Sequence, residues 1–95
     1  MRAIEMRHSG SAYTFAMRLR ASRQRAGMTP EAVAAAVHVT VKRITTLEAG
    51  GSAPPTAQQV AALARALNVP ALWLLAGDLA GAQFRPAWYA PGGAA

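Results

Sequence analysis

Two helix-start signals stand eleven residues apart in the middle of the chain, and they limit the folds open to it. The first is the Thr-Pro-Glu stretch at residues 29–31. There threonine is suited to cap a helix, proline fits the first helical position, and glutamate complements the positive end of the helix dipole. The second signal is Thr40, which follows a break in the apolar pattern at His38. The chain must therefore form two short helices that are joined by a tight turn.

Apolar residues at helical spacing predict three further helices around this pair. Thr14 is placed to cap a first helix over residues 15–25, and Gly27 would end it. A fourth helix is expected from Thr56 through Leu67, and a short fifth helix after Pro70. Five helices without a strand pattern predict an all-α domain. Its core is expected from these side chains: Phe15, Leu19, Val33, Val37, Ile44, Leu47, Leu63 and Leu67, with Leu72, Trp73 and Leu75 as candidates in the fifth helix.

Composition divides the chain into three parts. Residues 1–13 show no sustained period and contain a Ser-Gly-Ser stretch, as expected for a flexible N-terminal arm. Residues 14–77 hold the five helices, and residues 78–95 form a tail rich in glycine, alanine and proline. Trp88 and Tyr89 interrupt that tail. They either pack back on the domain, take part in a dimer contact, or belong to a partly ordered tail.

The charge balance favours a polyanionic partner, since ten Lys and Arg residues oppose four Asp and Glu residues for a formal charge of +6. Among polyanionic partners, nucleic acid is the first candidate and an anionic membrane surface the second. The pair Lys42 and Arg43 matters most, because it stands at the start of the third helix; a merely solvated helix face is the alternative. The apolar runs are too short to span a bilayer and no secretory signal pattern is visible, so we expect a cytoplasmic protein outside the membrane.

Catalytic and metal-binding sets are not recognisable in the sequence. There is no cysteine, the two histidines stand in different segments, and the four acidic residues are scattered. No Ser-His-Asp or Cys-His arrangement and no glycine-rich phosphate loop can be assembled. We therefore expect no enzymatic activity, no cofactor and no bound metal.

The stretch 29–50 resembles the helix-turn-helix of the phage repressor and Cro family, also called the XRE family. The residues that carry the resemblance are Thr29 as cap, Ala34 in mid-helix, the turn at His38 and Val39, the second cap Thr40, and the ending Leu47, Glu48, Ala49 and Gly50. The flanking stretches 19–23 and 63–75 are similar to the family as well. The resemblance implies a five-helix, repressor-like DNA-binding domain.

The resemblance also implies roles for single positions. Base-contacting side chains of the family correspond to Val41, Lys42, Thr45 and Thr46. Lys42 would donate to guanine O6 or N7, and Val41 would touch a thymine methyl group. Contacts to the DNA backbone are expected from Thr29, Glu31, Thr40, Arg43, Gly51 and Ser52. Arg23 and Glu48 match a family ion pair that would join the first helix to the third.

Two positions depart from the family pattern. Pro30 stands where the family often has a glutamine that reaches a phosphate, so that contact is missing or replaced. His38 occupies a turn position that is usually glycine, and we expect a positive φ there. A histidine tolerates this backbone region better than most residues do, at some cost in strain.

The function implied by the resemblance is sequence-specific binding of double-stranded DNA. Members commonly act as homodimers on an inverted repeat, and repression of transcription is the expected outcome. The alternative is an antitoxin-type protein that binds a toxin through the 78–95 tail and also regulates its own operon.

Overall fold

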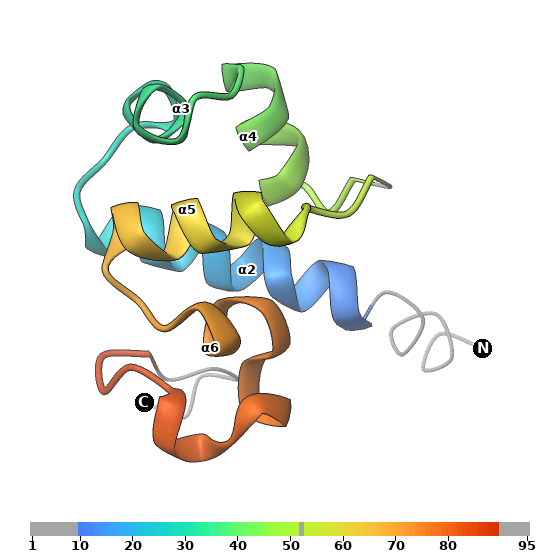
Figure 1. Ribbon diagram of the computed structural model, residues 1–95, viewed down its shortest axis with the longest axis vertical. Helices are drawn as coiled ribbons and strands as arrows, with labels where there is room; N and C mark the ends of the chain where they lie inside the picture. The colour runs from blue at the N-terminus through green and yellow to red at the C-terminus, as the bar shows by residue number, and fades with distance from the viewer. Residues whose placement is uncertain (1–9, 52, 90–95) are drawn as a thin grey trace.

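The computed structural model describes residues 10–51 and 53–89. Its elements follow in the order α2 (Gly10–Arg25), α3 (Pro30–Val37), α4 (Val41–Glu48), α5 (Ala57–Leu67) and α6 (Ala71–Ala76), then the 3₁₀ turns η1 (Gly77–Ala80) and η2 (Ala82–Phe84). In Figure 1, α2 and α5 lie in the middle of the molecule, α3 and α4 at one end, and α6 with the 3₁₀ turns at the other. The predicted all-α class is confirmed, and the described residues contain no strand.

Three threonine side chains set where helices begin, as their positions in the sequence predict. Each hydroxyl oxygen accepts a 3.0 Å hydrogen bond from the N–H of the third helical residue: Thr29 from Ala32, Thr40 from Arg43, and Thr56 from Gln59. At Thr56 the Gln59 side chain accepts in return from the threonine N–H at 3.1 Å. Such caps satisfy amide groups that have no partner inside the helix. They keep α3, α4 and α5 short and separate.

His38 ends α3 in the left-handed conformation, with φ 61° and ψ 46°. This confirms the positive φ expected at the turn. The next residue, Val39, donates its N–H to the carbonyl of Ala34 at 3.0 Å, which closes the end of the helix. A non-glycine residue in this region costs about 1 kcal/mol of backbone strain. The turn between α3 and α4 is therefore tight and well defined.

The core is built mainly as the apolar pattern predicts. All eight residues predicted from the first four helices are buried: Phe15, Leu19, Val33, Val37, Ile44, Leu47, Leu63 and Leu67. They form one cluster with Val60, Val69 and the residues of α6 that face inward. Burial of this apolar surface stabilises the packing of such short helices.

The prediction for α6 was partly wrong. Trp73 is buried as expected, but Leu72 and Leu75 are 56% and 51% exposed, and Leu74 is fully buried in their place. Residues three apart share one face of a helix, so Leu72 and Leu75 point the same way. Trp73 and Leu74 occupy the opposite side, and the large indole ring takes the place nearest the core.

The first helix begins at Gly10 and not at Phe15, so Thr14 lies inside α2 and is not its cap. The last four residues of the expected arm 1–13 are thus helical. Adding residues to an existing helix is far easier than starting one, so α2 extends beyond the apolar stripe that anchors it. Residues 1–9, on which the rest of that prediction falls, lie outside the described residues.

The chain after α6 folds back on the domain. The Trp88 and Tyr89 rings meet the Trp73 ring edge-on, with centroids 6.0 Å and 4.9 Å apart. Aromatic pairs in this geometry add to the stabilisation that burial provides. Of the three interpretations of Trp88 and Tyr89, the structure supports packing on the domain itself. Residues 90–95 of the expected tail lie outside the described part.

No single helix among the described residues is long and apolar enough to cross a membrane. Only the pair of α5 with residues 71–80 reaches the required length and composition, and the two halves are bent by 117°. The large apolar residues of α5, Val60, Leu63 and Leu67, are buried in the core.

Candidate nucleic-acid interface

The α3 and α4 helices form one end of the molecule and meet across the turn at residues 38–40. In Figure 1, α3 is seen end-on beside α4, so the two helix axes cross steeply. Val33 and Val37 of α3, and Ile44 and Leu47 of α4, are buried toward the core. The opposite side of α4 is therefore left to solvent.

Three of the four predicted base-contacting side chains share the exposed side of α4. Val41, Lys42 and Thr45 are all exposed. Thr45 lies three residues after Lys42 and four after Val41, so it neighbours both of them on the helix surface. We call Val41, Lys42 and Thr45 the α4 outer face. It combines an apolar group, a cation and a hydroxyl next to the N-terminal end of the helix.

Thr46, the fourth predicted base contact, is only partly exposed and packs against the loop that follows α4. A Cβ atom on Gly51 would collide with its side-chain methyl group. The Gly51 N–H also donates to the Thr46 carbonyl at 2.9 Å. Glycine is required at position 51 by this close approach, and its amide already has a partner inside the protein.

Arg43 holds the α4–α5 loop. Its guanidinium donates to the carbonyls of Ala53 and Pro54 at 3.1 Å and 2.9 Å, and to Gln59 Oε1 at 2.9 Å. Three of its five N–H donors are thus used within the chain. The resemblance assigned this side chain to the DNA backbone, and that contact stays a prediction; two of its five N–H donors are left for it. The sequence does not identify the two carbonyl partners, because every residue has a backbone carbonyl and only the fold decides which ones Arg43 meets.

Arg23 and Glu48 lie in contact and connect α2 to the last turn of α4. The Arg23 Nε and Nη2 atoms donate to the two carboxylate oxygens of Glu48 at 2.6 Å and 3.0 Å. Nη1 of Arg23 also donates to the Met28 carbonyl at 3.0 Å. The side chains are only 14% and 10% exposed, and the hydrogen bond to Glu48 is the main cause that raises the pKa of Arg23. This two-point contact restrains the C-terminal end of α4.

Arg18, in the second half of α2, is buried. Its Nε and Nη2 atoms donate to the Leu74 and Leu75 carbonyls, at the end of α6, at 2.9 Å and 2.8 Å. Desolvation lowers its pKa, while the nearby Tyr89 and Asp78 oppose that shift.

The position of Arg18 contains a signal that sequence reasoning missed. Residue 18 lies three positions after Phe15 and one before Leu19, which places it on the buried stripe of α2. Gly77 makes room for it, because a Cβ atom there would lie 2.6 Å from Arg18 Nη1, and Gly77 also has φ +62°. The guanidinium is therefore part of the packing between α2 and α6, on the side of the molecule away from α4.

The remaining predicted backbone contacts lie at the beginnings of α3 and α4. The hydroxyls of Thr29 and Thr40 accept the capping bonds, and Glu31 is exposed in the first turn of α3. Pro30 has no N–H and the Ala32 amide is bound by the cap, so the Glu31 amide is the first-turn donor left to an outside partner. Ser52 lies outside the described residues.

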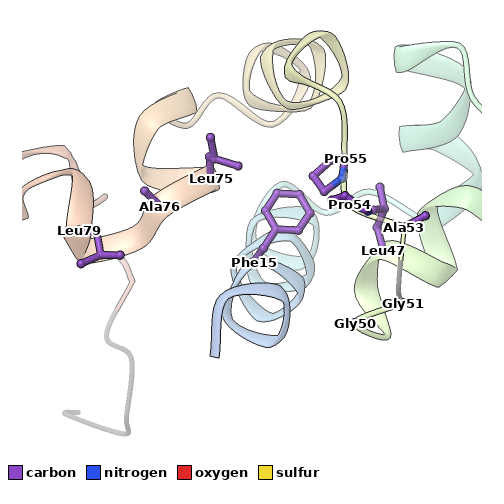
Figure 2. A pocket seen from close by; sticks show the side chains of 10 residues that line it. All are labelled: Phe15, Leu47, Gly50, Gly51, Ala53, Pro54, Pro55, Leu75, Ala76 and Leu79. Atoms are coloured by element: carbon purple, nitrogen blue, oxygen red, sulfur yellow. The ribbon is translucent and has the colours of Figure 1, made fainter. Parts of the chain in front are cut away.

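An apolar groove of about 430 Å³ lies on another side of the domain. Figure 2 shows Phe15 at its centre, with Leu75 and Leu79 on one side and Pro54 and Pro55 on the other. None of the ten described residues that line it carries a charge. Its side chains therefore cannot neutralise DNA phosphates.

Within the described residues, no group of three or more His, Cys, Asp or Glu side chains is placed to hold a metal ion. Of the acidic residues described, Glu48 is bound to Arg23 and Asp78 lies 3.6 Å from the Arg85 guanidinium.

Comparison with protein families adds one finding to this geometry. A family model described as a helix-turn-helix domain matches residues 14–72. The match includes most of α2, all of α3, α4 and α5, and the start of α6. The comparisons with curated proteins and with solved structures found no significant match.

Proposed function

The chain belongs to the helix-turn-helix family of DNA-binding domains, and from that premise we propose that it is a transcriptional repressor of the phage repressor and Cro type. The observation that carries the proposal is the α4 outer face, Val41, Lys42 and Thr45, exposed on a helix whose other side is buried. A helix presented in this way fits the major groove of B-DNA, which is about 12 Å wide.

In this proposal α4 is the recognition helix and its outer face reads the bases. The Lys42 ammonium group donates to guanine O6 or N7, and the Val41 methyl groups contact a thymine methyl group. The Arg23–Glu48 pair acts as a positioning contact, because it holds the far end of α4 against α2. Thr46 and Arg43 position the loop after α4, so we assign them supporting roles close to the DNA.

The DNA backbone contacts follow from the helix ends. The Glu31 amide in α3 and the Val41 and Lys42 amides in α4 lie in the first turns next to the caps Thr29 and Thr40, and such amides suit a phosphate oxygen. The Arg43 amide is already bound by Thr40. The formal charge of +6 adds an attraction that does not depend on sequence. Contacts with phosphates would fix the orientation of the domain on the DNA, and contacts of the α4 outer face with the bases would give sequence specificity.

We propose that the functional unit is a homodimer, because one domain reads too few base pairs for useful specificity. The apolar groove around Phe15 supports this arrangement. A second copy of a chain with formal charge +6 can approach an uncharged groove without meeting like charges directly. Leu79, which is 91% exposed at its edge, is available to be buried by that copy.

The dimer proposal is tested by two separate variants, each of which introduces one glutamate at an exposed leucine. We expect Leu79→Glu to weaken self-association by about tenfold or more, as measured by analytical ultracentrifugation, because burying an unpaired carboxylate is costly. Leu72→Glu is the control, since Leu72 is exposed on α6 but does not line the groove. A wild-type chain that stays monomeric on its DNA site would contradict the dimer.

The antitoxin alternative draws no support from the described part of the tail. That alternative used residues 78–95 as the arm that binds a toxin. Trp88 and Tyr89 instead pack on Trp73 of the same chain. We therefore retain the repressor, and not an antitoxin that binds a toxin and regulates its own operon, as the proposed function.

The experiment that tests the repressor proposal is selection of binding sites from a random DNA pool, followed by titration of the best site against salt. We expect an inverted repeat, and log affinity that falls linearly with log salt by roughly 0.9 per phosphate neutralised. Weak binding that is indifferent to sequence would contradict a sequence-specific regulator.

A further inference from the structure

The hydroxyl group of Thr45 is already committed as a donor. Thr45 is exposed in the middle of the α4 outer face, and its Oγ1 atom donates to the Lys42 carbonyl at 3.0 Å. A threonine hydroxyl has one proton and two lone pairs. With the proton directed at the backbone of its own helix, Thr45 offers an outside partner only acceptor sites and a methyl group.

The edges of the four bases differ in what they can give to such a group. In the major groove adenine N6 and cytosine N4 carry hydrogen-bond donors, whereas guanine O6 and N7 and thymine O4 are acceptors. We propose that Thr45 selects adenine or cytosine, the bases with an amino group, on the strand that it faces. Guanine or thymine there would oppose two acceptors and leave both without a partner. This inference rests on the proposed function, with α4 as the recognition helix.

Lys42 makes the proposed selection directional. Its ammonium group has three donors and no acceptor, which is the opposite of what Thr45 presents. The two residues are three apart and therefore neighbours on the helix surface. A base with acceptors opposite Lys42 and a base with an amino group opposite Thr45 would satisfy both side chains. Reversing either base pair would place a donor opposite Lys42 or an acceptor opposite Thr45.

The methyl group of Thr45 provides a competing expectation that the test must separate. A methyl contact would favour the C5-methyl of thymine, so the same position would select thymine. Thr45→Val keeps the branched shape and removes the oxygen, whereas Thr45→Ser keeps the hydroxyl and removes the methyl group. Both changes lie on an exposed helix surface, so both variants are expected to fold, which circular dichroism and thermal melting would check.

The test is site selection from a random DNA pool by the wild-type chain and by these two variants. We expect one position in each half-site to be adenine or cytosine for the wild type and Thr45→Ser, and to lose its preference for Thr45→Val. On that site, reversing the base pair should weaken wild-type binding by about five- to tenfold, the value of one hydrogen bond, and should change Thr45→Val binding by less than about twofold.

A synthetic base gives an independent measurement on the same DNA. Replacing the selected base by an analogue without its amino group should weaken the wild type to the level of Thr45→Val and leave that variant unchanged. Thymine at the affected position, or a preference that survives in Thr45→Val, would overturn the inference while the inverted repeat leaves the proposed function standing. A wild-type pool without any enriched motif would overturn both.

Discussion

The two ends of this domain are held together by different means. At the α3–α4 end the buried side chains are small or aliphatic, the helices begin at threonine caps, and one ion pair joins α4 to α2. At the α6 end Trp73 lies under Trp88 and Tyr89, and the buried Arg18 binds the last carbonyls of α6. The two ends thus rely on different interactions: capped helices and an ion pair beside α4, and aromatic packing with a buried arginine at α6. Under the proposed function, the exposed side of α4 is the one available to DNA.

The basic side chains divide into those bonded inside the chain and those left exposed. Arg18, Arg23 and Arg43 bind carbonyls or a carboxylate inside the chain, so they contribute to positioning. Lys42 is exposed on the α4 outer face. The formal charge of +6 counts these internally bonded arginines as well, so it exceeds the charge that α4 presents to solvent. Under the proposed function, placement rather than net charge decides which cation contacts the bases.

The largest expected effect is at the α6 end. Trp73→Ala removes a ring that is 1% exposed and contacts two other aromatic rings, so we expect a loss of about 3–5 kcal/mol in the free energy of unfolding. Chemical denaturation would measure it. Leu72→Ala is the matched control on the same helix, and its effect should be under about 0.5 kcal/mol because the side chain is exposed. Equal losses in the two variants would break the comparison.

At the other end Glu48→Ala should cost about 3 kcal/mol, because it leaves the mostly buried Arg23 guanidinium without its carboxylate. Unlike the Trp73 change, this one should also weaken DNA binding by the folded protein, since α4 loses its contact with α2. Denaturation and binding titrations would be run side by side. Unchanged stability together with unchanged affinity would contradict the positioning role.

A smaller effect is expected for Arg18→Ala, about 2 kcal/mol, because two buried carbonyls at the end of α6 lose their donor. We expect DNA affinity of the folded variant to stay within about twofold of wild type, since the contact lies away from α4. Arg20→Ala removes an exposed arginine of the same helix and serves as the control. If Arg18→Ala lowered affinity while the fold stayed intact, the division between the two ends would fail.

Most of what could be predicted from sequence is local; the exception is the Arg23–Glu48 pair, 25 residues apart, which the family resemblance supplied. Thr29, Thr40 and Thr56 act on amides three residues away, so their caps are visible as short motifs. The left-handed turn at His38 is local in the same sense. The apolar period also located the core of the first four helices, because the side that must be buried repeats along each helix.

The rest depended on tertiary contacts; the position of Arg18 on α2 could have indicated its burial, but no motif identifies the partners of these side chains. Arg18 meets carbonyls 56 and 57 residues away, and Arg43 meets carbonyls in a loop of irregular conformation. The α6 helix is too short for its apolar period to show which side faces the core, and the structure buries the side with Trp73 and Leu74. The place of Trp88 and Tyr89 also depended on an aromatic partner distant in sequence.

The most direct test of the central claim compares two variants that remove the same charge from opposite ends. Lys42→Ala changes the α4 outer face, and Arg85→Ala changes a partly exposed arginine beside Asp78 at the α6 end. Fluorescence anisotropy on the selected DNA site would give both affinities at one salt concentration. We predict a loss of about five- to a hundredfold for Lys42→Ala, with relaxed preference at one guanine, and less than about threefold for Arg85→Ala. Equal losses would mean that net charge alone holds the DNA, and would contradict recognition through α4.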